Sequence, residues 1–218
     1  MLRKLMSLVA VFALLPTVAY AAEGEGLTSA QLQLGVDALW VMLAAILVIA
    51  MQAGFALLEA GSTRMKNAGH VAGKTILTFG VCALAFWALG FGFAFGDGNG
   101  WIGLSGFFPN GTETQAEAFF SSLSFSDIPI TIKFLFQLAF AGVSLAVACG
   151  GFAERAKLSV YILFGAIFTM FIYPVVAHWI WGGGWLAEHG KQDFAGSTVV
   201  HLQGATAALV ATLLLKPR

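Results

Sequence analysis

The stretch Asp193–Leu215 reads DFAGSTVVHLQGATAALVATLLL. It is long and apolar enough to cross the roughly 30 Å hydrocarbon core of a membrane, which takes about 20 helical residues. His201 stands inside it. An ionisable residue within a membrane segment is a candidate functional residue by default, so this stretch decides both the fold class and the search for a site.

The composition of the whole chain supports a membrane protein. Hydrophobic residues make up 59% of the 218 residues and charged residues 10%, whereas soluble domains contain about 45–50% apolar residues. The apolar runs are continuous rather than alternating, so we predict an all-α membrane protein and not a water-soluble enzyme. The net charge of zero gives no indication of a nucleic-acid partner. The predicted spanning helices cover 36–58, 75–95, 132–152, 158–180 and 194–215.

The first residues, MLRKLMSLVAVFALLPTVAYA, have the pattern of a secretory signal. Arg3 and Lys4 precede a short apolar core, and Ala-Tyr-Ala fits a small-x-small cleavage site. The alternative is an uncleaved anchor helix, but the run is short and Pro16 interrupts it. We therefore predict a signal peptide over 1–21 and a mature chain, 22–218, that begins outside the cytoplasm.

The distribution of basic residues predicts the same orientation. The segments 61–74, 153–157 and the C-terminus would be cytoplasmic, and cytoplasmic loops carry an excess of Lys and Arg. Their basic residues are Arg64, Lys66, Lys74, Arg155, Lys157, Lys216 and Arg218, against Lys133 and Lys191 outside. We predict a multi-pass protein of the plasma (inner) membrane with a cytoplasmic C-terminus. The external loop 97–127 has no Lys or Arg, and we expect it to pack over the outer ends of the helices.

Asp193 and His201 occupy chemically meaningful positions in the last predicted helix. Asp193 precedes it as an N-cap would, with a carboxylate that accepts from the free N–H groups of the first turn. His201 follows eight residues later, roughly 12 Å along a helix, which predicts a place near the middle of the bilayer. The neighbours at helical spacing are small residues, which let helix backbones approach: Ser197, Thr198, Gly204, Ala205 and Ala208.

We therefore expect the face that carries His201 to pack against protein and not against lipid. Burial disfavours a charged ring, so the imidazole should be neutral, with one donor and one acceptor nitrogen. Such a ring could pass hydrogen bonds to a small polar molecule without trapping an ion. The alternative is a histidine that donates to a neighbouring carbonyl and has no other role.

Aromatic residues form a second candidate site towards the outer end of the helices. Phe136 and Phe140 are four residues apart and share a helix face. Trp181 is followed by three glycines, which allow a sharp turn beside it. Aromatic faces attract cations. Phe pairs are also common in core packing, and Trp179, Trp181 and Trp185 could form an interfacial belt, so both interpretations remain open.

The other cysteines and histidines have simpler interpretations. Cys82 and Cys149 lie inside apolar runs and predict buried core residues, with no disulfide framework and no metal site. His178 and His189 stand at the outer boundary, where a histidine is usually a solvated polar residue.

Three segments of the chain resemble the ammonium transporter (Amt/Mep/Rh) family. They read MQAGFALLEAGSTRMKNAGH (51–70), FQLAFAGVSLAVACGGFAERAKL (136–158) and WGGGWLAEHGKQDFAGSTVVHLQGATAALVATLLL (181–215). The resemblance implies five transmembrane helices that form the first of two inverted repeats of the ammonium transporter fold.

The resemblance also implies a role for each candidate residue. Trp181, Phe136 and Asp193 would form the outer vestibule that recruits ammonium, and Asp193 would also fix the conformation there. Phe140 would be the pore gate, and His201 would line a hydrophobic pore as the relay for proton and ammonia. Ammonium would lose its proton before or during passage, and potassium, which cannot, would be excluded.

The partners that the resemblance implies are ammonium or ammonia, membrane lipid, further copies of the chain in a homotrimer, and a PII-type regulatory protein at the cytoplasmic face. It implies no enzymatic activity, no metal and no other cofactor. Family members have a second repeat with another pore histidine, and this chain stops after the first. We therefore expect either a fragment of a longer chain or a truncated gene product.

Three alternatives to a complete transporter follow from the sequence. The same fold could form a membrane ammonium sensor, or the chain could be an inactive truncated half-transporter. The third is an intramembrane hydrolase that uses Ser197 and His201, which are one turn apart. No activated-serine motif or oxyanion hole is visible for it.

Overall fold

The computed structural model describes residues 26–217, apart from the side chains of Glu113 and Glu117. The predicted signal peptide, 1–21, lies outside the described residues. The described part is helical and contains no strand, although one isolated antiparallel bridge joins Gly98 to Gly103. Five helices are long and apolar enough to cross a membrane, as predicted: Ser29–Ser62, Met65–Phe95, Ile130–Gly150, Leu158–Glu188 and Ser197–Leu215.

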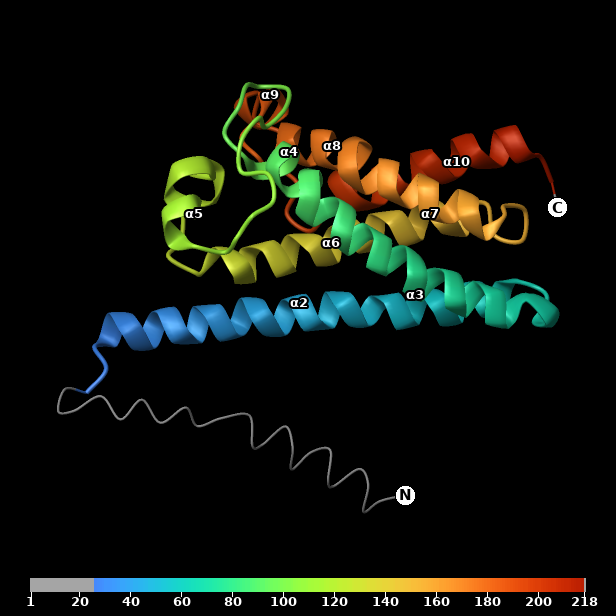
Figure 1. The fold of residues 1–218 in the computed structure, drawn as a ribbon, viewed down its shortest axis with the longest axis horizontal. Helices are drawn as coiled ribbons and strands as arrows, with labels where there is room; N and C mark the ends of the chain where they lie inside the picture. The colour runs from blue at the N-terminus through green and yellow to red at the C-terminus, as the bar shows by residue number, and fades with distance from the viewer. Residues whose placement is uncertain (1–25, 218) are drawn as a thin grey trace, which may run out of the picture. The chain divides into compact units, whose positions relative to one another are not determined.

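These five segments are built from the labelled helices of Figure 1. The first is α2 (Ser29–Ser62) and the third is α6 (Ile130–Gly150). The second contains η1 (Met65–Asn67), α3 (Ala68–Ala85), η2 (Phe86–Gly90) and α4 (Phe91–Phe95). The fourth contains α7 (Leu158–Ile167), η4 (Phe168–Ile172), α8 (Tyr173–Ile180) and α9 (Trp185–Glu188), and the fifth contains η5 (Ser197–Leu202) and α10 (Gln203–Leu215). The loop helices are α5 (Glu113–Phe119) and η3 (Ser121–Leu123).

The chain divides into two units, Met1–Gln33 and Leu34–Arg218. The described part of the first unit is the beginning of α2. There the Thr28 hydroxyl accepts from the Gln31 N–H at 3.3 Å, while the Gln31 side chain accepts from the Thr28 N–H at 2.9 Å. This reciprocal capping box supplies partners for N–H groups that a helix start leaves free.

Three of the spanning segments contain a π-helical turn, namely η2, η4 and η5. Pro174, the second residue after η4, has no N–H to donate, so the regular i→i−4 ladder cannot run through it. Gly90, at the end of η2, faces η4: a Cβ there would lie 2.4 Å from the Thr169 carbonyl oxygen. The close contact between the second and fourth segments therefore requires glycine at this position.

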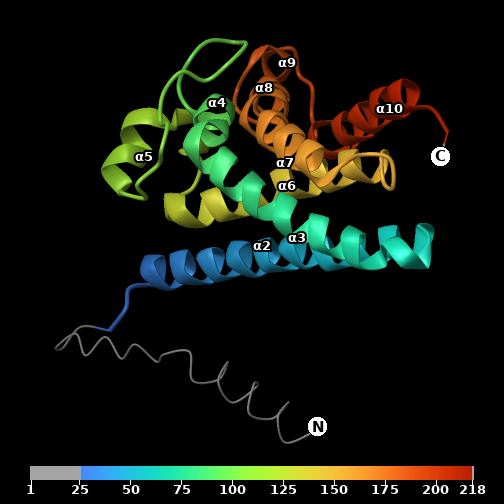
Figure 2. The same cartoon turned by 45° about the vertical axis from the view of Figure 1, so that its right-hand side comes forward.

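The second unit packs around an aromatic core. The Phe86 ring lies 5.9 Å from Phe91 and 6.1 Å from Tyr173, joining the second and fourth segments. Helix α10 packs on α6, and α3 packs on both α6 and α7. Figures 1 and 2 show the loops with α5 and α9 at one end of these helices and the C-terminus at the other.

The loop 97–127 packs over one end of the helices, as predicted. Its Phe120 is buried, with its ring 4.9 Å from that of Phe91. A hydrogen bond connects the two ends of the loop, because the Asp97 N–H donates to the Phe119 carbonyl at 2.8 Å. The loop therefore forms a cover on the helix ends and not a separate domain.

The described structure changes the assignment of Lys74. We predicted it to be in a cytoplasmic loop over 61–74, but α3 already begins at Ala68 and the Lys74 side chain is only 1% exposed. Its ammonium group forms an ion pair with the Glu59 carboxylate of α2 and lies 4.8 Å from the centre of the Tyr161 ring. Burial is possible because a neighbouring carboxylate and an aromatic face replace water around the charge.

Candidate functional site

The predicted aromatic residues lie together between α6 and the end of α8. The Phe136 and Phe140 rings are 5.0 Å apart in an edge-to-face arrangement, and the Phe140 ring is 5.8 Å from that of Trp181. The Trp181 indole N–H donates to the Asp193 carbonyl at 2.6 Å, which fixes the ring towards the last spanning segment. The chain turns sharply after Trp181, as predicted, and Gly183 has φ +79°.

Asp193 caps the last helix, though from further upstream than predicted. Its Oδ1 accepts from the N–H groups of Gly196 and Ser197 at 2.7 and 2.9 Å. Its Oδ2 accepts from those of Thr198 and Val199, also at 2.7 and 2.9 Å. Residues 194–196 turn before the helix begins, and Gly196 takes φ +88°, a conformation that favours glycine.

The cap determines the charge of Asp193. Its partial burial disfavours ionisation, but the four backbone N–H donors outweigh this and lower the pKa of the carboxyl below its ordinary value of 3.8. The negative charge also lies at the positive end of the helix dipole. Because both oxygens are occupied by backbone donors, Asp193 is suited to fix the helix start and not to hold a cation on its own oxygens.

His201 lies on the face of η5 that the described chain leaves exposed. Ser197 and Ala205 are exposed with it, whereas Val200 and Gly204 are buried against α6. Close approach of helices does occur in this segment, but on the face that carries Gly204 and not on the face of His201. A Cβ at Gly204 would lie 2.7 Å from the Ser144 carbonyl oxygen of α6. The expectation that the His201 face itself packs against protein is wrong for the described residues.

The helix start also changes the expected depth of His201. The helix begins at Ser197 and not directly after Asp193, because residues 194–196 form the turn that brings the carboxylate under the N–H groups. His201 is therefore four residues, roughly 6 Å, below the helix start instead of roughly 12 Å.

Two polar residues extend the site beyond the predicted set. The Ser144 hydroxyl, one turn below Phe140 on α6, donates to the Val200 carbonyl at 2.9 Å and ties η5 to α6. The Gln203 amide donates to the Ile172 carbonyl at 2.8 Å in the π-helical turn η4. A buried serine in a membrane helix is a signal that sequence reasoning can use, because it needs a partner.

The remaining tryptophans and cysteines that the sequence singled out pack against other side chains or are buried in the core. Trp179 and Trp185 make a second aromatic group with Trp101, at ring distances of 6.1 and 5.4 Å from it. Cys82 and Cys149 are free and buried, as predicted. In residues 26–217, no group of three or more His, Cys, Asp or Glu could hold a metal ion.

The hydrolase alternative loses its geometric support. The Ser197 hydroxyl donates to Asp193 Oδ1 at 3.3 Å, so its hydrogen bond is used at the helix start.

Comparison with known proteins identifies the family. The model of the Ammonium Transporter Family matches residues 39–218. The chain belongs to the ammonium transporter family. It is 40% identical over 197 residues to ammonium transporter Amt2 of Archaeoglobus fulgidus, which covers 85% of this chain and 40% of that protein. It is 35% identical over 210 residues to an ammonium transporter of Aquifex aeolicus, with 95% and 47% covered.

Solved structures of ammonium transporter relatives have the same fold. A protein described as a sensor Amt protein superposes with a TM-score of 0.77 at 35% identity, over 86% of this chain and 46% of that one. Mep2 of Saccharomyces cerevisiae superposes with a TM-score of 0.72 at 32% identity, over 82% and 42%. The chain thus spans less than half the length of these relatives. The relatives named here are transporters and a sensor, in agreement with the expectation that the chain is not an enzyme.

Proposed function

We propose that this chain forms the N-terminal half of an ammonium transport path. The observation that carries the proposal is the series of contacts from the aromatic rings of α6 through Trp181 to Asp193, which caps the helix that bears His201. The aromatic group of Phe136, Phe140 and Trp181 stands beside the capped helix start at Asp193, and His201 follows one turn below that start.

Ammonium would be recruited at the aromatic group. A cation near an aromatic face gains about 0.5–2 kcal/mol, more as water is removed. Trp181 and Phe136 would supply these faces, and Phe140, which contacts both rings, would act as the gate. Asp193 would contribute by holding the helix start and, through its carbonyl, the Trp181 indole N–H.

Below the gate, the molecule that passes would be neutral ammonia and not ammonium. Moving a monovalent cation through an apolar membrane region costs several kcal/mol, so loss of a proton to give ammonia lowers the barrier. His201 would then exchange hydrogen bonds with ammonia through its one donor and one acceptor nitrogen. Potassium has no proton to lose and would be excluded by the same path.

The exposed face of η5 and α10 supports a path that is completed by further protein. It carries His201 among apolar residues, including the exposed Leu202, Leu209 and Leu213. Since the chain spans less than half of its relatives, we propose that an inverted second half covers this face.

The assembly and membrane placement belong to the same proposal. Residues 1–21 would be removed as a signal peptide, and the mature N-terminus would lie outside the plasma (inner) membrane, with the C-terminus of this segment in the cytoplasm. The protein would form a homotrimer, and a PII-type protein would bind at the cytoplasmic end. The exposed apolar side of α2, which includes Leu39 and Trp40, supports contacts with lipid or other subunits.

Uptake of radioactive methylammonium by cells that lack their own ammonium transporters tests the proposal. With this chain expressed together with the second half that completes the path, we expect uptake that depends on the protein, that excess ammonium suppresses and that excess potassium leaves unchanged. Trp181→Ala should lower uptake strongly, whereas Trp179→Ala, two residues earlier in the last turn of α8 and outside the aromatic group, serves as the matched control. Equal uptake with and without the protein, at confirmed membrane expression, would refute a transport role.

A sensor is the second candidate, because a solved structure that superposes well is described as a sensor Amt protein. A sensor would bind methylammonium in purified form with the same dependence on Trp181 and give no uptake. Binding without uptake would therefore replace the transport proposal with this one.

A further inference from the structure

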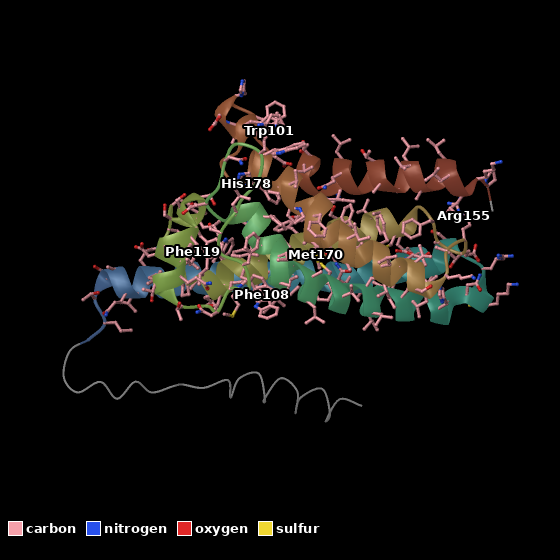
Figure 3. All side chains as sticks on the ribbon, turned by 45° about the horizontal axis from the view of Figure 1, so that its top comes forward. Trp101, Phe108, Phe119, Arg155, Met170 and His178 are labelled. Atoms are coloured by element: carbon pink, nitrogen blue, oxygen red, sulfur yellow. The ribbon has the colours of Figure 1, made fainter. Side chains whose placement is uncertain are left out.

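His178 has an arrangement that its position at the outer boundary did not predict. The side chain is in the last turn of α8 and the residue is only 3% exposed, instead of solvated as we expected. Its Nδ1 lies 3.0 Å from the Ala94 carbonyl oxygen of α4, and its Nε2 lies 2.8 Å from the Asn99 carbonyl oxygen of the outer loop. Figure 3 shows His178 and Trp101 at one end of the molecule and Arg155 at the other.

Both partners of the ring are acceptors. A backbone carbonyl has no hydrogen to donate, and a neutral imidazole has only one N–H. In a neutral ring, the second nitrogen would therefore point its lone pair at a carbonyl oxygen within hydrogen-bond distance. Only the imidazolium donates from both nitrogens, and hydrogen bonds from a charged donor are the stronger kind.

The charges around His178 are also those that a cation needs. Asp97 of the outer loop and Glu188 of α9 line the same cavity of about 460 Å³. Among the described residues that line this cavity, His178 is the one that can carry a positive charge. Besides Asp97 and Glu188, the others, from the outer loop, η3 and the glycine turn after Trp181, are Gly96, Gly98, Asn99, Gly100, Ser121, Ser122, Gly182 and Gly183. On its own helix, His178 lies in the last turn, at the negative end of the helix dipole, which favours positive charge.

We propose that His178 is an imidazolium that docks the outer loop and the end of α4 onto α8, one turn before Trp181. The loop is docked while the ring carries both protons and is released as rising pH removes one. Through the Gly184 N–H, which donates to the His178 carbonyl at 2.9 Å, the same turn is tied to the glycines after Trp181. His178 is thus a positioning residue for Trp181, and this last step rests on the proposed function of the aromatic group.

Histidine ring nitrogen NMR on the full protein in lipid nanodiscs tests the protonation directly. The chain has four histidines, and the His178 signal is assigned by its absence from His178→Gln. We expect both ring nitrogens of His178 to carry protons at neutral pH. A single-proton, neutral ring at His178 under those conditions overturns the proposal, and this readout does not depend on transport.

Hydrogen exchange tests the docking. Three backbone amides report on the loop. The Asn99 N–H donates to the Ile102 carbonyl and the Leu104 N–H to the Asp97 carbonyl, both within the loop, while the Gly103 N–H donates to the Phe93 carbonyl of α4. After correction for the intrinsic pH dependence, their exchange should become on the order of tenfold faster as the ring deprotonates, the loss expected for one charge-assisted hydrogen bond. His178→Gln should exchange fast at every pH, and the control His189→Gln should follow the wild type.

A pH-independent wild-type loop would contradict the docking role. If the wild-type protein shows the imidazolium signal and pH-dependent exchange of the loop but takes up no methylammonium, only the proposed transport function is contradicted. The two failures are therefore distinguishable.

Discussion

Replacing Asp193 with asparagine should destabilise the start of the last spanning helix. The carboxylate receives four backbone N–H groups, two on each oxygen. Asparagine keeps one acceptor oxygen, and its NH2 group would face the other two N–H groups whichever way the amide turns. Two backbone donors therefore lose their partner, and the charge that favours the helix start is removed.

The expected size of the effect follows from these contacts. A hydrogen bond to a charged group contributes about 1.5–3 kcal/mol, and water can reach part of this turn, so we take the lower value for each lost bond. The total is about 3 kcal/mol. For a chain of this length, 1 kcal/mol shifts Tm by about 2–4 °C, which predicts a decrease of about 6–12 °C.

Thermal unfolding of the purified protein in detergent measures this shift, with Asp127→Asn as the control that removes an exposed carboxylate from the outer loop. Amide exchange at Gly196–Val199 should become faster in Asp193→Asn alone. A Tm within 1–2 °C of the wild type, together with unchanged exchange at these four amides, would refute the cap as the main role of Asp193.

Four further results are expected. Because the pKa of Asp193 is lowered, the cap is fully formed above about pH 4–5, and the Tm difference between wild type and Asp193→Asn should shrink as the pH falls through the lowered value; a constant difference from pH 6 to pH 3 would contradict this. Gly196→Ala should cost about 1–3 kcal/mol in unfolding free energy, since φ is +88° and the added Cβ would lie 2.6 Å from Val200; an unchanged Tm would show that the turn relaxes. Lys74→Met should cost about 3–5 kcal/mol by leaving Glu59 without its cation, and adding Glu59→Leu should restore part of the loss, whereas an equally unstable double variant would argue against the ion pair. Ser144→Ala should cost about 1 kcal/mol through its bond to the Val200 carbonyl, and a stability equal to the wild type would mean that this bond contributes nothing.

The five spans and the aromatic group could be predicted from the sequence, because both depend on local patterns. Continuous apolar runs require helices in a membrane, and Phe136 and Phe140 share a face at any regular helical spacing. The cap by Asp193 was also predictable, since an acidic residue before a helix has few other roles.

The predictions that the structure overturned concern residues whose position depends on backbone geometry or on partners far away in the sequence. Lys74 looked like a loop residue because its partner, Glu59, lies fifteen positions away on another helix. The π-helical turn η5 and the turn at 194–196 moved the helix start, and with it the predicted depth and face of His201. His178 was missed because both of its acceptors are backbone carbonyls, which every residue has.

The claim on which the account depends most is that the exposed face bearing His201 lines the ammonium path. Methylammonium uptake by His201→Ala, compared with His189→Ala at an exposed histidine outside η5 and α10, tests it directly at matched membrane levels. We predict at least an order-of-magnitude loss for His201→Ala, about 1.4 kcal/mol or more in the barrier, and near wild-type uptake for His189→Ala. Wild-type uptake in His201→Ala would contradict the account.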